Sequence, residues 1–175
     1  MIVVFTGNGK GKTTATIGQM IRAAGQGKKS VMFQFIKGPW ISGEHKFLNK
    51  YKALKGKLEI YRGGKGFVGI LGDKLPIEIH KKAAEDTLKK VAETIKSKKW
   101  DIVALDEVNV AVSLNLIKAS EVLKVIKDEP QKMIIVLSGQ HAPKSFIKRA
   151  DLVTEMREIK HPFSGREKAK VGFEF

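Results

Sequence analysis

The fold of this chain is decided near its start by the stretch Thr6-Gly7-Asn8-Gly9-Lys10-Gly11-Lys12-Thr13-Thr14. It is close to the phosphate-loop pattern G-x-x-x-x-G-K-[ST], with Thr6 where the first glycine usually stands. Glycines let successive backbone N–H groups turn toward an anion, and the helix that follows presents the positive end of its dipole. Lys12 would supply charge to the phosphates and Thr13 a hydroxyl ligand for Mg²⁺. We therefore predict a site for a nucleoside triphosphate, ATP with Mg²⁺, on the residues Gly7, Asn8, Gly9, Lys10, Gly11, Lys12, Thr13 and Thr14.

Apolar runs and helical periodicities alternate along the rest of the chain. We expect strands over residues 1–5, 30–36, 58–61, 101–105, 133–137 and 152–155. Helices are expected over residues 12–24, 43–55, 77–97 and 143–149, and in a segment that Ser120 caps and that ends before Pro130. This alternation predicts an α/β fold of the P-loop NTPase type, with a mostly parallel sheet and helices on both faces. The length of 175 residues fits one nucleotide-binding domain over residues 1–175.

Two acids follow one of the buried strands. The apolar run 102–105 leads directly into Asp106 and Glu107. In parallel sheets ligands gather at the carboxyl ends of the strands, so these carboxylates are expected to meet the phosphate loop and organise Mg²⁺. The alternative is that they only cap a following helix. We also expect no side-chain nucleophile, because no convincing pair of nucleophile and base is present.

Composition limits the remaining choices. The chain has no cysteine and no apolar run near the about 20 residues that a membrane span needs, so we expect a cytoplasmic protein without a membrane partner. Its 33 basic and 18 acidic side chains give a formal net charge of +15. That charge would attract polyanions, but paired lysines are also typical of solvated helix faces, so a nucleic-acid partner is not expected. The spacing of His45, His80 and His141 does not suit a metal, and these three are expected at the surface.

Several short motifs occur in a fixed order along nearly the whole chain. They are the phosphate loop, Gln34-Phe35-Ile36-Lys37-Gly38, Leu105-Asp106-Glu107, Val153-Thr154-Glu155-Met156, Lys160-His161-Pro162-Phe163 and Gly172-Phe173-Glu174-Phe175. Together they resemble the P-loop ATP:corrinoid adenosyltransferase family, which acts on cob(I)alamin and cob(I)yrinic acid a,c-diamide. The phosphate loop and Gln34–Gly38 are the most specific of these motifs.

The resemblance implies a reaction in cobalamin biosynthesis. The family moves the 5′-deoxyadenosyl group of ATP to the reduced cobalt of a corrinoid and releases triphosphate. It binds the nucleotide reversed relative to other P-loop proteins. Thr13 and Glu107 match its metal ligands, with Asp106 adjacent, and Phe67 matches an aromatic residue that faces the corrinoid. The resemblance also implies a homodimer and an electron-donor protein as partner. His161 lies in a family motif, where a structural role and a substrate contact are both open.

Three positions depart from the family pattern. Gly69 replaces a corrinoid-facing tryptophan, Gln140 replaces an arginine that would contact phosphate, and Val110 replaces a tyrosine near the acids. These departures leave two alternatives open besides adenosyl transfer. One is a nucleic-acid-stimulated P-loop ATPase, which the net charge favours. The other is a nucleotide- or corrinoid-binding protein without turnover.

Overall fold

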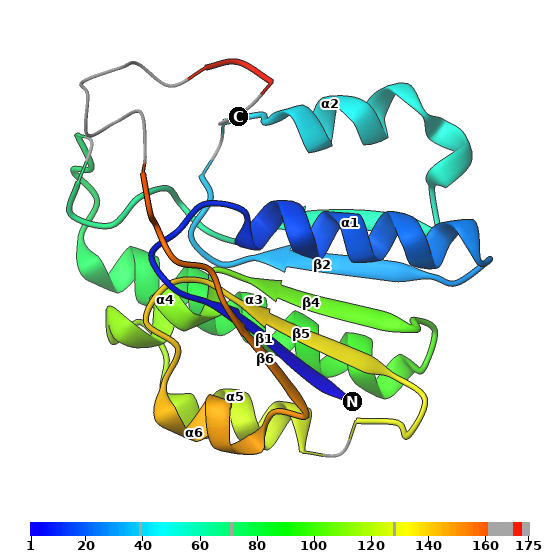
Figure 1. Cartoon of the computed structure of the whole chain (residues 1–175). Coiled ribbons are helices and arrows are strands. Elements are labelled where there is room, and N and C mark those ends of the chain that lie inside the picture. Colours follow the sequence, from blue (N-terminus) through cyan, green and yellow to red (C-terminus); the bar gives the residue numbers. More distant parts are fainter. Residues whose placement is uncertain (39, 71, 128, 161–169, 173–175) are drawn as a thin grey trace.

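The computed structural model describes residues 1–38, 40–70, 72–127, 129–160 and 170–172. Six strands form one sheet in the order β3-β2-β4-β5-β1-β6, and every neighbouring pair is parallel. The strands are β1 (Ile2–Thr6), β2 (Ser30–Gln34), β3 (Leu58–Arg62), β4 (Ile102–Asp106), β5 (Ile134–Ser138) and β6 (Leu152–Glu155). The strand of the phosphate loop, β1, and the strand of the two acids, β4, therefore flank β5 (Figure 1).

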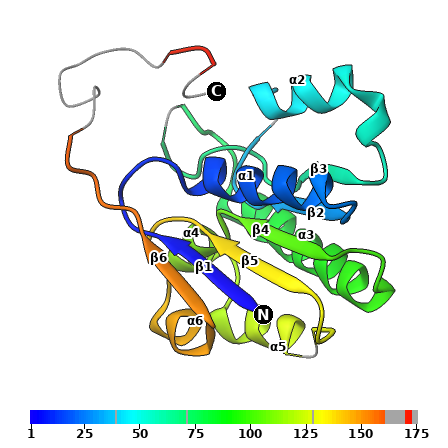
Figure 2. The same ribbon diagram turned by 45° about the vertical axis from the view of Figure 1, so that its right-hand side comes forward.

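Helices cover both faces of this sheet. On one face lie α1 (Lys12–Gly25) and α2 (Gly43–Lys50), followed by the short 3₁₀ turn η1 (Lys52–Leu54). On the other face lie α3 (Ile77–Ser97), α4 (Val108–Ser113), α5 (Ala119–Ile126) and α6 (Lys144–Arg149) (Figure 2). Parallel strands need such crossover helices, which shield both faces of the sheet from water. The predicted α/β fold with a parallel sheet and helices on both faces is confirmed.

The core has two layers because successive strand residues point to opposite faces. Val3, Phe5, Met32, Ala104 and Val136 pack with Met20 on the α1 side. Their strand neighbours, including Val4, Val31, Phe33, Val103 and Leu137, pack against α3 to α6. This burial on both faces explains why the strands read as continuous apolar runs rather than as alternating ones. Among the described residues, no helix is both long and apolar enough to cross a bilayer.

Some local predictions were wrong. The helix expected over residues 43–55 ends at Lys50, and only the 3₁₀ turn Lys52–Leu54 continues it. Ser120 does not cap the next helix. That helix begins at Ala119, and Lys118 is its N-cap residue, whose backbone N–H bonds to Glu121 at 2.9 Å. The short helix α4 was not predicted, because its six residues are too few to show a period.

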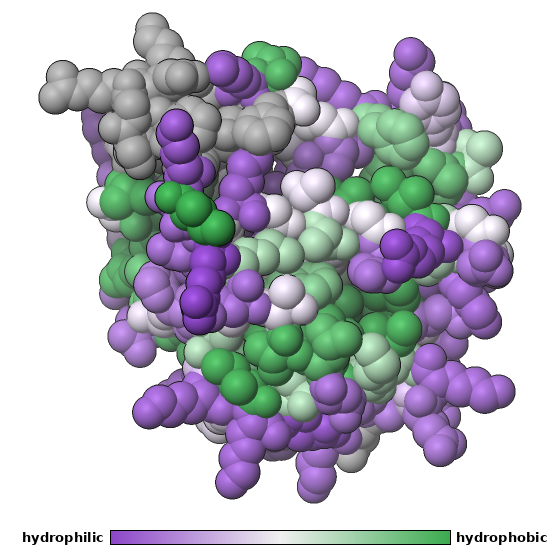
Figure 3. All heavy atoms as spheres, viewed as in Figure 1, coloured by the Kyte–Doolittle hydropathy of each residue, from purple (hydrophilic) through white to green (hydrophobic). Residues whose placement is uncertain are grey.

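The surface mixes polar and apolar areas. In Figure 3, polar side chains surround green apolar patches, one of which lies where α1 and α2 face each other. Ile21 of α1 and Phe47 of α2 are exposed there.

Candidate functional site: a phosphate loop facing two carboxylates

The phosphate loop ends in a helix whose first amides have no side-chain cap. Gly11 is the N-cap residue of α1, with a φ of 114° that favours glycine, and the first turn of α1 contains no acidic residue. The N–H groups of the first turn of a helix have no partner within the helix. They and the positive end of the helix dipole are therefore available to an anion at the cleft.

The glycines earlier in the loop allow a close backbone approach. Gly7 has a φ of 94°, and a Cβ atom on it would collide with the backbone of Met156. A Cβ atom on Gly9 would lie 2.7 Å from the carbonyl carbon of Arg157. The Gly9 N–H donates to Met156 O at 2.7 Å, and the Met156 N–H donates to Thr6 O at 2.8 Å. The segment after β6 thus holds the loop from behind and leaves its α1 end to the cleft.

Lys12 folds back over the loop that it belongs to. Its ammonium donates to Gly7 O at 2.8 Å and Gly9 O at 2.6 Å, and the residue is buried. Burial lowers the pKa of Lys12, and the nearby Glu107 and Asp106 carboxylates oppose that change. An anion arriving at the loop would satisfy the lysine better than two carbonyl oxygens, because charge-assisted hydrogen bonds are the stronger ones.

Asp106 is fully buried and joins three strand ends. The Thr13 hydroxyl donates to its Oδ1 at 3.0 Å, and the Ser138 hydroxyl, at the end of β5, donates to the same oxygen at 2.6 Å. Its Oδ2 lies 3.4 Å from Gln34 Nε2 at the end of β2. The prediction that Asp106 meets the phosphate loop is therefore consistent with the geometry, although Asp106 contacts the loop through Thr13.

Glu107 faces the cleft directly. Its backbone has a φ of 60°, in the left-handed region that is costly for a residue with a side chain and that is frequent at functional sites. Burial, reinforced by the charge of Asp106, raises the pKa of Glu107 to about 7, while Lys12 and Lys37 oppose this. A cation beside Glu107 would favour the carboxylate form and relieve this burial penalty.

A third wall of the cleft comes from the segment after β2. Lys37 pairs with Glu44 of α2 at 2.9 Å, and Gln34 Nε2 lies 3.4 Å from the same Glu44 oxygen. Burial alone would raise the pKa of Glu44, but the Ser42 hydrogen bond and the Lys37 ammonium lower it to about 2. Sequence reasoning missed Gln34, Ser138 and the Lys37–Glu44 pair as a connected set. The sequence could have indicated Gln34 and Ser138 by their positions, since both end strands at the same edge of the sheet as Asp106.

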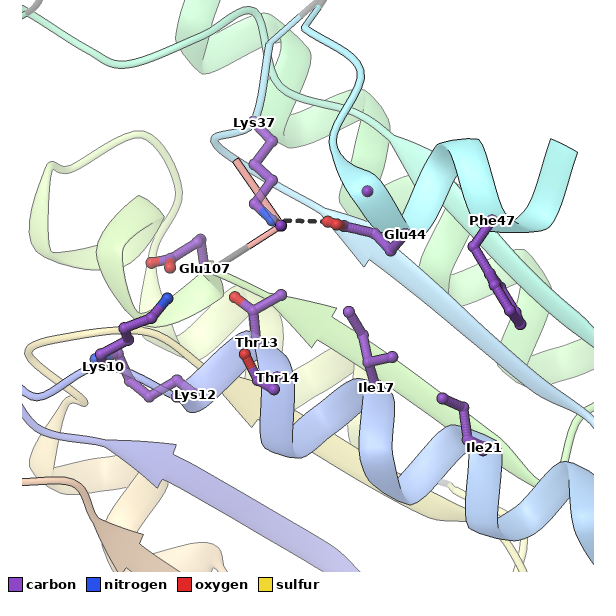
Figure 4. A pocket seen from close by; sticks show the side chains of 13 residues that line it. Lys10, Lys12, Thr13, Thr14, Ile17, Ile21, Lys37, Glu44, Phe47 and Glu107 are labelled. Carbon is purple, nitrogen blue, oxygen red and sulfur yellow. Dashed lines mark hydrogen bonds and ion pairs between the residues drawn. The ribbon is translucent and has the colours of Figure 1, made fainter. Parts of the chain in front are cut away.

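The cleft between these walls has a volume of about 920 Å³. Lys10, Lys12, Thr13, Thr14, Lys37, Glu44 and Glu107 line its polar part (Figure 4). Ile17 and Ile21 of α1 and Phe47 of α2 continue it as an apolar groove. Of the predicted residues, Lys10 to Thr14 and Glu107 thus share one cleft, Asp106 supports it from the core, and Gly7 to Gly9 form the loop behind it.

Phe67 lies outside this cleft lining, on the loop between β3 and α3. It is exposed and packs against Trp40, with ring centroids 5.9 Å apart. Gly38 and Gly66 approach so closely beneath this pair that a Cβ atom on Gly38 would lie 2.7 Å from Gly66 Cα. Gly69, which replaces the expected tryptophan, has a φ of 69°, a conformation that disfavours a tryptophan. Trp40 therefore supplies the second aromatic ring beside Phe67.

The other predicted departures have defined surroundings. Gln140 Nε2 lies 3.5 Å from Asn8 O, so the glutamine does reach the phosphate loop. Val110 packs against the core.

Two of the histidines lie elsewhere than expected. His45 and His80 are buried, so the expectation that they lie at the surface was wrong, whereas His141 is exposed. His161, most of its motif, and Phe173, Glu174 and Phe175 lie outside the described residues.

The fold and cleft define the chain as an α/β P-loop nucleotide-binding domain. Solved structures of low sequence identity share this fold. The flagellar accessory protein FlaH from Methanocaldococcus jannaschii has a TM-score of 0.57 at 14% identity, over 88% of this chain and 69% of FlaH. A KaiC-like protein from Pyrococcus horikoshii has a TM-score of 0.56 at 13% identity, over 91% of this chain and 73% of that protein.

The sequence comparisons define the family within that class. Residues 1–175 match the family of ATP:corrinoid adenosyltransferases BtuR/CobO/CobP. A corrinoid adenosyltransferase from Sinorhizobium sp is 37% identical over the whole of this chain and 80% of its own length. One from Escherichia coli K12 is 32% identical over the whole of this chain and 85% of its own length. The chain belongs to the ATP:corrinoid adenosyltransferase family, which confirms the resemblance seen in the motifs.

Proposed function

We propose that this protein transfers the 5′-deoxyadenosyl group of ATP to the reduced cobalt of a corrinoid. Besides membership of the family, the arrangement of the cleft supports this proposal. The uncapped start of α1 faces Glu107 across the cleft, and Thr13 is held by a 3.0 Å hydrogen bond to Asp106. The whole triphosphate can be held there as a leaving group, since Lys10, Lys12 and Lys37 line the same cleft.

The chemistry needs no side-chain nucleophile. The cobalt(I) centre attacks C5′ of the ribose, a cobalt–carbon bond forms, and the bond from C5′ to the triphosphate oxygen breaks with its electron pair on the triphosphate. The protein contributes orientation and charge stabilisation of the leaving group. Lysine ammonium groups and the amides at the start of α1 would carry that stabilisation.

Mg²⁺ fits this cleft as a partner of the triphosphate. Within the described ranges, no three His, Cys, Asp or Glu side chains group as a ready-made metal site. Mg²⁺ is commonly held by only one or two carboxylates together with substrate phosphates. Thr13 and Glu107 would be its ligands, with Asp106 holding the Thr13 hydroxyl, and the ion would neutralise charge on the triphosphate.

The Trp40–Phe67 pair is the proposed contact for the corrinoid. Both rings are exposed although they are large and apolar, with Phe67 on the loop that follows β3 and Trp40 on the segment between β2 and α2. Aromatic faces of this kind suit a broad, flat macrocycle. We also propose that the protein forms a homodimer and that an electron-donor protein reduces the corrinoid. The net charge of +15 would attract an acidic donor.

An anaerobic assay tests the function. Purified protein is mixed with ATP, Mg²⁺ and chemically reduced cob(I)alamin, and the corrinoid absorption spectrum is followed. We expect the spectrum of an adenosylated corrinoid to appear only when ATP is present. If neither cob(I)alamin nor reduced cob(I)yrinic acid a,c-diamide is adenosylated while ATP still binds, the proposal is wrong. Light scattering of the same preparation tests the dimer.

A further inference from the structure

The loop that carries Phe67 is fixed at its first end by strand β2. We call the described residues between β3 and α3, 63–70 and 72–76, the Phe67 loop. The N–H groups of Gly63 and Gly64 donate to Gln34 O at 2.9 and 3.0 Å, and the Gly66 N–H donates to Ile36 O at 3.1 Å. These bonds attach the loop to the segment that lines the nucleotide cleft.

The second end of the loop is held by hydrogen bonds to one carboxylate. Asp73 Oδ2 accepts the Gly69 N–H at 2.8 Å, and Asp73 Oδ1 accepts the Leu75 N–H at 3.1 Å. The Asp73 N–H in turn donates to Ile70 O at 3.2 Å. The two accepted amides lower the pKa of Asp73, with a smaller contribution from His80. Gly69 suits this turn because its positive φ directs its N–H toward the carboxylate without a side-chain penalty.

His80 connects this turn to the body of the protein. Its Nε2 lies 3.0 Å from Asp73 Oδ2, and the side chains of both residues are nearly inaccessible to solvent. This Nε2 atom makes no hydrogen bond of good geometry within the described residues, so its link to Asp73 is the close contact with the carboxylate. His80 stands in the first turn of α3, whose residues Ala84, Leu88 and Val91 are buried in the core. The turn is thus tied to an element with little freedom to move.

We infer that Asp73, held by His80, is a positioning residue that sets Phe67 against the corrinoid. Phe67 lies between the two attachments, two residues before Gly69 and one after Gly66, and its own ring is exposed apart from Trp40. Without the Asp73 bonds the loop would keep its first attachment and the packing of Val68 against the core, but its second end would lose both amide bonds. The ring would then sample many positions, and ordering it would oppose binding of the macrocycle. The inference rests on the proposed function, because it assigns Phe67 to the corrinoid.

The first test compares the effect of one substitution on the corrinoid with its effect on ATP. Asp73→Asn preserves side-chain size but removes one acceptor oxygen and the charge. We expect the KM for cob(I)alamin to rise by about tenfold, as misplacement of a contact group predicts, while the Kd of ATP stays unchanged. Asp86→Asn is the matched control, because in the described part of the chain Asp86 pairs with Lys82 and Lys89 on the exposed face of α3. An unchanged KM for the corrinoid, or an equal loss of ATP affinity, would overturn the inference.

A double-mutant cycle asks whether Asp73 acts through Phe67. If it does, adding Asp73→Asn to Phe67→Ala should raise the corrinoid KM by less than about twofold further, since coupled residues are not additive. Two effects that multiply would show that Asp73 acts elsewhere and would contradict the inference.

A third measurement does not depend on turnover. Hydrogen exchange of the Gly69 and Leu75 amides should be faster in Asp73→Asn than in Asp86→Asn, and emission of Trp40 should change in a Trp100→Phe background. If the wild type adenosylates no corrinoid, the proposed function fails, and this measurement still reports on the loop. If both amides keep their protection, Asp73 does not hold the loop and the inference fails on its own.

Discussion

The Thr13 hydroxyl donates a 3.0 Å hydrogen bond to the buried Asp106 carboxylate, and this bond joins the phosphate loop to the end of β4. It fixes the side chain that is expected to reach Mg²⁺. Thr13→Ala should therefore lower the Mg²⁺-dependent turnover by about 10- to 100-fold, whereas Thr13→Ser should retain most of it. Titration of activity with Mg²⁺ measures the effect. Equal activity of the alanine and serine variants would contradict this role of the hydroxyl.

Replacing Lys12 should weaken binding of the triphosphate. Loss of a buried, charge-assisted partner costs about 2–5 kcal/mol, so Lys12→Ala should weaken ATP binding by about 30-fold or more. Isothermal titration calorimetry with ATP and Mg²⁺ measures the change. Lys90→Ala, on the exposed face of α3, is the control and should bind ATP like the wild type. Unchanged ATP affinity in Lys12→Ala would exclude the phosphate loop as the binding site.

Glu107 should make the stability of the metal-free protein depend on pH. Its folded pKa is raised to about 7 from 4.5, so its favourable contribution is complete below pH 4.5 and is lost as the pH rises through 7. At about 1.4 kcal/mol per tenfold change in proton affinity, the loss is on the order of 3 kcal/mol. Glu107→Gln should therefore be more stable than the wild type at pH 8, and the difference should vanish near pH 4.

Urea unfolding at several pH values, with a chelator present, measures this difference. The same variant should show little Mg²⁺-dependent turnover, because it lacks a carboxylate ligand. A Glu107→Gln protein that is less stable than the wild type at pH 8 would show that the carboxylate is not strained by its burial.

Gln140 offers a gain-of-function test. It replaces an arginine of the family pattern and lies 3.5 Å from Asn8 O at the phosphate loop. Gln140→Arg would bring a guanidinium to the loop that is proposed to hold the triphosphate, and if its longer side chain reaches a phosphate oxygen, the charge-assisted contact should tighten ATP binding by about tenfold. Calorimetry at low and moderate salt measures it. Binding that is unaffected at both salt concentrations would place residue 140 away from the phosphates.

The sequence predicted what depends on local pattern. Continuous apolar runs predicted the buried strands, and the glycine loop before a helix predicted the loop conformation proposed to hold phosphate, because both signals lie within a few neighbouring residues. The meeting of Gln34, Asp106 and Ser138 depends instead on strand order, which places β4 between β2 and β5. His80 was misjudged for another reason, since its burial depends on how the nearby Asp73 turn folds against α3, which helical periodicity does not reveal. The roles of Phe67 and Glu107 remain predictions.

The central claim is tested most directly by the phosphorus product of a single turnover. ATP, Mg²⁺ and cob(I)alamin are reacted anaerobically with excess protein, and the quenched mixture is analysed by phosphorus NMR and by corrinoid chromatography. Attack at C5′ predicts one intact triphosphate for each adenosylated corrinoid. Release of ADP and phosphate without a cobalt–carbon product would contradict the account and show that the cleft works as an ordinary ATPase.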